Sequence, residues 1–406
     1  MKFYSGYIFI SALLSVGTLA SFNKVKSSDV ETSKSTPIIY QNQNNNSVLT
    51  VSQITNLGQP QIQLHTDSVY TSLNFNSSLF TQIPTGYEDK IISFQLPKGY
   101  MVVFAENNDG SGESACFVAV KSDIKANLPK RLQNNISYIR FIPFNNCDKK
   151  GAANIKDATV NALNATWFYG WSLNRNSFPN QQFVPMTWGK TTAIDEKAKY
   201  LIERKDIDHL LSFNEPDGKG QSNIQDFDTA ITRYKIMLKT GLRLGSPATT
   251  QDQAFRDGRW LPKFMEKANT EKVRVDYIAV HWYDWGNEKT NKETDALTAE
   301  AIFKRFVNYM EKLHATYPDK PIWLTEFNAN VNRTSEEVHK QFMELAVDWM
   351  NDQDYVERYA YFFERNHPEL NTDKSLTAIG QLWKSLKTNK SVTKNITQDA
   401  SIIKGK

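Results

Sequence analysis

The sequence predicts a two-part protein of the α/β class: a (β/α)8 barrel of the TIM type preceded by a small all-β sandwich module. The chain has 406 residues, of which 40% are hydrophobic, so it can bury a large core. Short β-rich runs separated by turns fill residues 47–146, as expected for a small sandwich. Strand-like and helix-like segments then alternate over residues 147–388, which is typical of a parallel α/β fold.

The first 20 residues have the pattern of a secretory signal peptide. Lys2 precedes a short apolar run, and small residues lead up to Ala20. The apolar run is too short to cross a membrane comfortably, and no later segment approaches about 20 apolar residues. We therefore expect a secreted protein, extracellular or periplasmic, with a polar linker over residues 21–46.

The predicted module contains several short strands and turn clusters. From residue 91 to residue 142 it resembles a βγ-crystallin Greek key. The resemblance is carried by the strand 100–104, the glycine-containing hairpin 107–112 and the closing segment 134–140. It implies that calcium could bind, although Gln133 departs from the calcium motif. The β-rich runs lie at residues 48–54, 91–94, 100–104, 116–120 and 136–141.

Eight strands and several amphipathic helices are expected in the second part. Apolar residues at helical spacing predict a helix over residues 302–313. A second stripe predicts a helix over residues 338–349, which begins with a capping box formed by Thr334 and Glu337. A last helix near residues 376–386 would close the barrel. The strands are expected at residues 151–155, 166–171, 183–187, 209–214, 243–246, 277–281, 322–326 and 357–363.

Composition argues against several classes of function. The net charge is +4, but six lysines against one acid from Lys384 onwards place the excess in a solvated basic tail, residues 389–406. We therefore expect no nucleic-acid partner, no membrane contact beyond secretion, and a monomer. Cys116 and Cys147 could form one disulfide, and neither the cysteines nor the histidines have a metal-binding spacing. Because no GxGxxG or P-loop motif occurs, no cofactor is expected.

Two predicted strands lead directly into glutamates. Glu215 follows the fourth strand, and Glu326 ends the seventh. One such glutamate could simply satisfy a helix N-terminus, but strands four and seven face one another across a barrel mouth, where catalytic groups lie. Paired carboxylates are what glycosidic cleavage requires: one protonates the leaving oxygen, and the other attacks the anomeric carbon or activates water. The pair predicts a glycoside hydrolase.

Further motifs, in consistent order over residues 149–383, resemble glycoside hydrolase family 128 within the clan of retaining barrel glycosidases. Gly170 and Tyr361 depart from this pattern, where asparagine and tryptophan respectively are common in the family. The resemblance implies an endo-acting hydrolase of β-1,3-glucan with a double-displacement mechanism. The motifs that carry it are residues 167–171, 183–189, 214–216, 244–248, 276–283, 325–327 and 358–362.

The same resemblance implies roles for individual residues. Glu215 would be the general acid/base and Glu326 the nucleophile, which suits a pair too close for both to ionise cheaply. Asn214 would donate to the 2-hydroxyl of the sugar, and Tyr283 would donate to the nucleophile. His281 lies two residues before Tyr283. A hydrogen-bonded core histidine and a site residue are equally reasonable interpretations of it.

Aromatic residues near strand ends suit the apolar faces of sugars, so they are expected to bind substrate. Taken singly, each tryptophan among them is more often barrel packing, but four near one rim favour a sugar cleft for at least two. The expected set is Trp171, Trp188, Trp282, Trp285 and Phe363.

Two other functions fit the sequence. One is a barrel glycosidase that acts on another β-glycan, such as a β-1,4-linked one. The other is a carbohydrate-binding protein that kept the cleft and lost turnover, although it would have no need of both glutamates. In either case the N-terminal module could anchor the protein to a surface or a polysaccharide.

Overall fold

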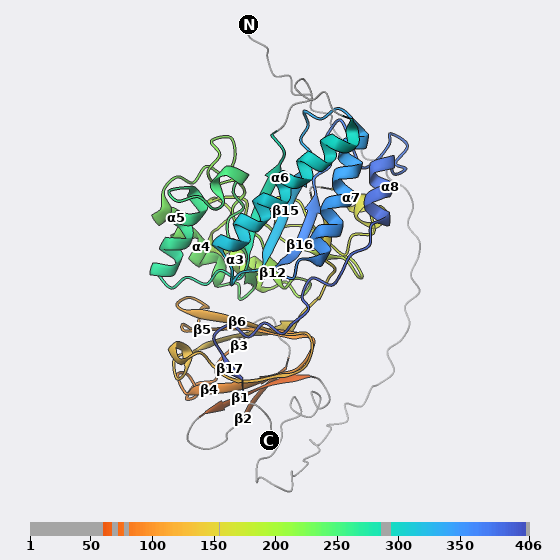
Figure 1. Ribbon diagram of the computed structural model, residues 1–406. Coiled ribbons are helices and arrows are strands. Elements are labelled where there is room, and N and C mark those ends of the chain that lie inside the picture. Colours follow the sequence, from red (N-terminus) through yellow and green to blue (C-terminus); the bar gives the residue numbers. More distant parts are fainter. Residues whose placement is uncertain (1–59, 67–71, 77–80, 154, 286–293, 403–406) are drawn as a thin grey trace, which may run out of the picture. The chain divides into compact units, whose positions relative to one another are not determined.

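The computed structural model describes residues 60–66, 72–76, 81–153, 155–285 and 294–402 (Figure 1). The expected signal peptide, the linker and the expected strand at residues 48–54 lie outside the described residues. The described chain begins with antiparallel strands and continues with parallel strands that alternate with helices. This order agrees with the α/β class that the sequence predicts for the second part.

The first strands form two antiparallel sheets. One has the order β17-β7-β4-β1-β2 and the other the order β3-β8-β5-β6. Phe94 of the first sheet meets Phe104 and Phe117 of the second, with ring centroids 5.3 and 4.7 Å apart, so the two sheets share one apolar core. The strands are β1 (Gln61–Thr66), β2 (Ser72–Asn76), β3 (Thr81–Gln82), β4 (Ile91–Leu96), β5 (Tyr100–Ala105), β6 (Ser114–Ala119), β7 (Ile124–Asn127), β8 (Tyr138–Pro143) and β17 (Ser401–Ile402).

The C-terminal segment differs from the sequence expectation of a solvated tail. Strand β17 pairs with β7, and Ile396 exchanges two backbone hydrogen bonds with Val118 of β6, both of 2.9 Å. Val392 is buried. The lysine-rich composition predicts a solvated tail, but the apolar residues between the lysines pack, and the backbone up to residue 402 extends the first sheet.

The second part contains eight parallel strands. Six of them form one sheet in the order β11-β10-β9-β16-β15-β14, and β12 pairs with β13. Single parallel bridges, Met186 to Leu211 and Gly245 to Tyr277, connect the two-stranded sheet to both edges of the larger one. The strands are β9 (Lys150–Ala153), β10 (Trp167–Tyr169), β11 (Gln182–Phe183), β12 (His209–Leu210), β13 (Arg243–Leu244), β14 (Ile278–Tyr283), β15 (Ile322–Asn328) and β16 (Val356–Tyr361).

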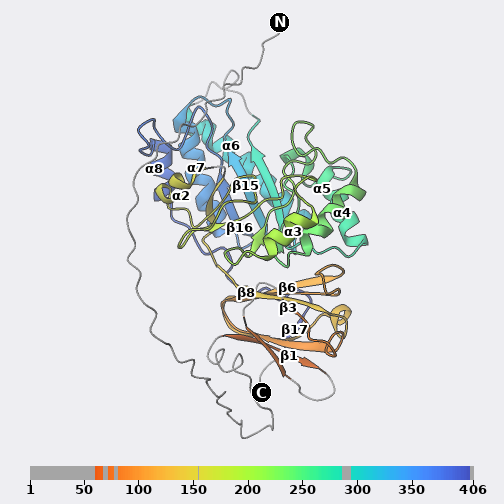
Figure 2. The same ribbon diagram turned by 180° about the vertical axis from the view of Figure 1, so that it is seen from behind.

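Helices follow the strands and bury one face each. Helices α6, α7 and α8 lie side by side next to β15 and β16, and α3, α4 and α5 form a second group, as both views show (Figure 2). The helices are α2 (Asp157–Ala162), α3 (Asp195–Ile202), α4 (Phe227–Leu238), α5 (Trp260–Thr270), α6 (Asp295–Thr316), α7 (Glu336–Asp352) and α8 (Ala378–Ser385), with 3-10 turns at Lys130–Leu132 and Gln251–Gln253.

The apolar stripe of α6 is confirmed, that of α7 is confirmed except at Leu345, which is 38% exposed, and one cap is shifted. Ile302, Phe306 and Leu313 of α6 are buried, as their spacing predicts. Helix α7 is capped by Ser335, whose side chain accepts from the backbone N–H of Val338, and not by Thr334. A Thr-Ser pair offers two adjacent caps, and the sequence alone does not decide between them.

A buried arginine on β8 ties the antiparallel strands to the helices. Arg140 is fully buried, and its guanidinium donates to the carbonyls of Arg204 (3.0 Å), Leu201 (3.5 Å) and Thr240. These carbonyls lie at the C-terminal ends of α3 and α4, where helices leave acceptors unsatisfied.

Candidate active site

Glu326 lies inside strand β15 and is almost completely buried. Its Oε1 accepts from the hydroxyl of Tyr169 (2.9 Å) and from the indole N–H of Trp171 (3.0 Å). Its Oε2 accepts from the hydroxyl of Tyr283 at 2.5 Å. Three donors from two other strand ends therefore fix both oxygens of this carboxylate.

Glu215 follows β12 on a loop with an unusual backbone. Its φ is +39°, in the left-handed region that side-chain-bearing residues rarely adopt, which is typical of functional sites. The backbone N–H of Glu215 donates to Ala248 at 2.7 Å. Two residues on, Asp217 accepts from the hydroxyl (2.6 Å) and the N–H (3.2 Å) of Thr250. The loop after β13 thus holds Glu215 in place.

His281 connects the two glutamates. Its Nδ1 is hydrogen-bonded to Oε1 of Glu215 at 2.9 Å and lies 3.5 Å from Oε2 of Glu326. Since one nitrogen reaches both, these carboxylate oxygens cannot be farther apart than the sum of the two distances. Burial opposes a charged imidazole, but the negative charges of Glu326 and Glu215 outweigh it and raise the pKa of His281.

The two tyrosines remain neutral donors. Burial is the larger cause and the charge of Glu326 the next, and together they hold the pKa of Tyr169 and Tyr283 well above the usual value. Deprotonating either would place a second negative charge against Glu326. Both hydroxyls can therefore donate to Glu326 without competing for a proton.

The glutamates open into a cleft of about 480 Å³. Asn214 precedes Glu215, and its Nδ2 donates to Oε1 of Gln221 at 3.2 Å, which orients the amide at the cleft. The ring of Phe362 lies between those of Trp171 and Tyr283, at centroid distances of 6.0 and 6.1 Å. The cleft is lined by Trp171, Trp188, Asn214, Glu215, Gln221, Tyr283, Glu326 and Phe362.

This site has two carboxylates, aromatic rings and an amide in one groove. These are the groups that bind a sugar chain and hydrolyse a glycosidic bond. The sequence profile of the family described as glycosyl hydrolase catalytic core matches residues 142–387.

The chain belongs to the glycosyl hydrolase catalytic core family.

Solved structures of other glycoside hydrolases are similar to this one. A family 128 subgroup I endo-β-1,3-glucanase variant from Amycolatopsis mediterranei, in complex with laminarihexaose, shares 26% identity with a TM-score of 0.51. The match covers 59% of this chain and 100% of that one. A second variant from the same organism, in complex with laminaripentaose, shares 26% identity with a TM-score of 0.50. That match covers 59% of this chain and 99% of the other. No curated protein sequence matches this chain.

The hydrolase cleft gathers most of the residues that the sequence predicts for it. Glu215, Glu326, Asn214, Tyr283 and two tryptophans, Trp171 and Trp188, line it. His281 lies directly beneath, between the carboxylates.

Three predicted sugar contacts lie elsewhere. Trp282 is buried against Phe306 and Phe342, because successive residues of β14 point to opposite sides and its neighbours His281 and Tyr283 face the carboxylates. Phe363 packs on Trp383 of α8. Trp285 is 71% exposed and lines a neighbouring cavity of about 230 Å³ with Phe255. None of the three lines the cleft, so the predictions for Trp282 and Phe363 need correction, and a sugar contact at the exposed Trp285 stays a prediction.

Three residues of the hydrolase site are missing from the sequence prediction. Tyr169 lies within the motif 167–171, and strand alternation from Trp171 would have placed both side chains on one face. Phe362, one residue before the predicted Phe363, faces the cleft instead. Gln221 has no signal in the sequence, because a loop brings it back to Asn214.

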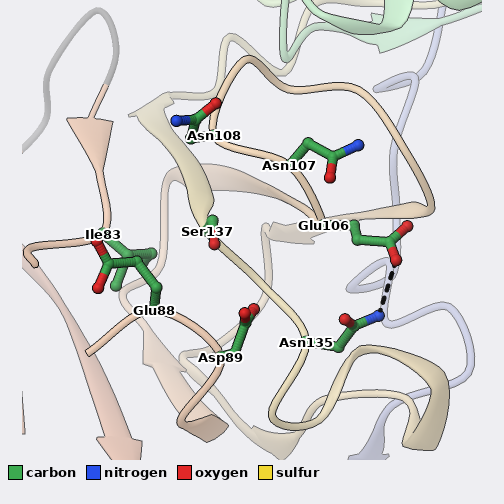
Figure 3. Close-up of a pocket in the computed structure, with 8 residues that line it drawn as sticks. All are labelled: Ile83, Glu88, Asp89, Glu106, Asn107, Asn108, Asn135 and Ser137. Atoms are coloured by element: carbon green, nitrogen blue, oxygen red, sulfur yellow. Dashed lines mark hydrogen bonds between the residues drawn. The ribbon is translucent and has the colours of Figure 1, made fainter. Parts of the chain in front are cut away.

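The antiparallel part of the hydrolase has its own polar cavity of about 350 Å³. Figure 3 shows carboxylates, amides and a hydroxyl around it, with Asn135 donating to Glu106 at 3.3 Å. Among the described residues, no three His, Cys, Asp or Glu side chains are arranged to hold a metal ion. Calcium binding stays a prediction. The lining residues are Ile83, Glu88, Asp89, Glu106, Asn107, Asn108, Asn135 and Ser137.

Two further points concern the hydrolase chain as a whole. Cys116 and Cys147 are both buried free thiols, so the disulfide considered from the sequence does not form. No helix in the described ranges combines the length and apolar character needed to cross a bilayer.

Proposed function

We propose that this glycoside hydrolase cleaves β-1,3-glucan internally by double displacement, with Glu215 as general acid/base and Glu326 as nucleophile. The carrying observation is the one histidine nitrogen that reaches both carboxylates in the cleft. The substrate follows from the similar endo-β-1,3-glucanase structures that hold laminari-oligosaccharides.

The distances favour retention over inversion. In retaining enzymes the carboxyl groups lie about 5–5.5 Å apart, and in inverting ones roughly 6.5–9.5 Å, which leaves room for a water. The path through Nδ1 of His281, with legs of 2.9 and 3.5 Å, sets an upper limit on the gap between Oε1 of Glu215 and Oε2 of Glu326 and supports the shorter, retaining separation.

In the first step an oxygen of Glu326 bonds to the anomeric carbon. The bond from that carbon to the bridging oxygen breaks, and Glu215 gives its proton to the departing sugar. In the second step Glu215, now a carboxylate, takes a proton from water, whose oxygen displaces Glu326 from the anomeric carbon.

The two carboxylates are placed differently, which suits these roles. The side chain of Glu326 is 6% exposed and accepts three hydrogen bonds, whereas that of Glu215 is 16% exposed and is hydrogen-bonded to His281 alone among the described residues. Glu326 is therefore held still for attack, and Glu215 stays close to the leaving group and to water.

We also propose the finer features of the architecture. The two single bridges at the edges of the larger sheet support closure of the eight parallel strands into a (β/α)8 barrel. The shared core of the two antiparallel sheets supports a small sandwich module over residues 47–146. Secretion through residues 1–20 and a monomeric state are proposed from the sequence.

The experiment is hydrolysis of laminarin and curdlan, compared with cellulose and mannan, by wild type, Glu215→Gln and Glu326→Gln. We expect oligosaccharides of mixed length from the β-1,3-glucans only, and each variant to lose at least about a thousandfold in kcat. Nuclear magnetic resonance of the first product should show the β-anomer. An α-anomer would overturn the nucleophile assignment, and activity on cellulose or mannan alone would overturn the substrate.

A further inference from the structure

Glu326 is held by neutral donors. Tyr169, Trp171 and Tyr283 supply its three hydrogen bonds, and none of these side chains carries charge. Among the described residues, His281 is the only basic side chain paired with it, at 3.5 Å. No lysine or arginine of the described chain forms an ion pair with this carboxylate.

Two of the donors come from one short segment. Strand β10 ends at Tyr169, and Trp171 lies two residues beyond. Both donate to the same atom, Oε1 of Glu326, at 2.9 and 3.0 Å. We propose that Tyr169 and Trp171 are positioning residues for the nucleophile, and that Trp171 acts through its indole N–H rather than as a platform for sugar. This inference depends on the proposed role of Glu326.

The backbone at Trp171 supports this assignment. Its φ is +46°, a conformation that a bulky residue adopts only when its surroundings impose it. The conformation turns the indole edge toward Glu326, where Nε1 donates. A tryptophan needed only for its flat face would not require the strained backbone.

The rings around the two donors restrict their movement. The indole of Trp171 packs on Phe362, and the ring of Tyr169 stacks on Trp167 at a centroid distance of 6.4 Å. The hydroxyl of Tyr169 also lies 3.1 Å from the carbonyl oxygen of Thr325, next to the nucleophile in the chain. Oε1 of Glu326 is therefore fixed by Tyr169 and Trp171. The other oxygen, Oε2, accepts from Tyr283.

Neutral donors have a chemical consequence. A nucleophilic carboxylate loses its charge when it bonds to the sugar. A neighbouring arginine or lysine would oppose that loss through a full Coulomb attraction, whereas a hydroxyl and an indole N–H oppose it less. The arrangement orients Glu326 and keeps it reactive.

The test compares Trp171→Phe and Tyr169→Phe with Trp188→Phe, a matched change at a tryptophan in the same cleft whose indole forms no hydrogen bond with Glu326. All three keep an aromatic face. We expect kcat on laminarihexaose to fall about 10- to 100-fold in the first two, with KM within about twofold, because each loses one bond to a charged group. Trp188→Phe should change mainly KM.

A pH profile separates positioning from general damage. Donors stabilise the ionised carboxylate, so their loss should move the acidic limb of the kcat/KM profile to higher pH in Trp171→Phe and Tyr169→Phe. A variant that is merely loosened would lose amplitude without moving the limb. Thermal unfolding of each variant checks that the fold is kept.

The outcomes are distinguishable. A raised KM with unchanged kcat and an unmoved acidic limb in Trp171→Phe would overturn the proposal and restore the sugar platform. No turnover by wild type, and no covalent labelling of it by an activated 2-deoxy-2-fluoro laminaribioside, would overturn the proposed function itself. Labelling of wild type at Glu326, with slower labelling of both variants, supports both.

Discussion

At the scale of single residues, the site depends on the buried imidazole of His281, which lies between the two glutamates. Nδ1 of His281 faces Glu215 and Glu326, and Nε2 is buried with no hydrogen-bond partner among the residues that the structure describes. An imidazole that faces two carboxylates gains more from their charge than it loses by burial. The pair of glutamates therefore favours the protonated imidazole and raises the pKa of His281.

The raised pKa of His281 predicts that the stability of the protein depends on pH. Since the pKa of His281 is raised in the folded state, its contribution is fully present below the unfolded value of about 6.5 and is lost as pH rises through the folded value. We expect His281→Asn to lower the melting temperature most at acidic pH and to flatten its decline toward alkaline pH. Melting curves of both proteins from pH 5 to pH 9 check this, and parallel declines would contradict it.

The thiols are a second feature at this scale. Burial raises the pKa of Cys116 to about 12 and that of Cys147 to about 11. Both are then neutral and packed, as small apolar side chains would be, so a pair of cysteines in an expected secreted chain need not form a disulfide.

At the scale of elements, the fourth and fifth parallel strands are held by close packing and not by many backbone hydrogen bonds. Strands β12 and β13 have two residues each, and beyond them the chain is held by single bridges. At Gly245, just after β13, an added Cβ would lie 2.3 Å from the ring of Tyr277. That ring stacks on Trp323 at 4.1 Å, so it cannot move away.

Gly245→Ala should therefore destabilise the protein by about 1–3 kcal/mol through overpacking. Gly220→Ala is the control, because nothing lies within 4 Å of a Cβ there. Urea unfolding of both variants measures the difference in free energy. Equal midpoints would show that the β12–β13 region has more room than the structure indicates.

At the scale of the whole molecule, the antiparallel strands and the helices share one core. Met101, Val103 and Val118 belong to the same apolar cluster as residues of α4 and α5. Arg140 adds buried hydrogen bonds to the carbonyls after α3 and α4. The antiparallel strands therefore pack directly against the catalytic part, and an anchoring role for the predicted module stays a prediction.

Arg140→Met should cost about 3 kcal/mol or more, because it leaves buried carbonyls without donors. Arg256→Met is the control, since the Arg256 side chain is 60% exposed and its ion pair with Asp252 contributes little. Calorimetry should show one cooperative transition in both, moved to lower temperature only in Arg140→Met. Two separate transitions in the wild type would show that the parts unfold independently.

Sequence periodicity and chemistry predicted much of this molecule. Alternating strands and helices, the stripes of α6 and α7, and the two glutamates at strand ends all follow from local residue spacing. Those signals are strong because a buried face must repeat with the period of its element. Prediction from the sequence failed for Trp282 and Phe363, because the direction of one side chain decides whether it faces the cleft. It also missed Gln221, which a loop brings back to Asn214.

The sequence by itself determined the class of fold, the carboxylate pair and the order of the motifs, since these depend on local pattern. Tertiary structure alone decided which atoms meet: one nitrogen of His281 between Glu215 and Glu326, two donors from one segment on Oε1 of Glu326, and a lysine-rich end that pairs as a strand. The physical reason is that contacts between residues far apart in the chain depend on packing and on loop conformation, neither of which leaves a period in the sequence.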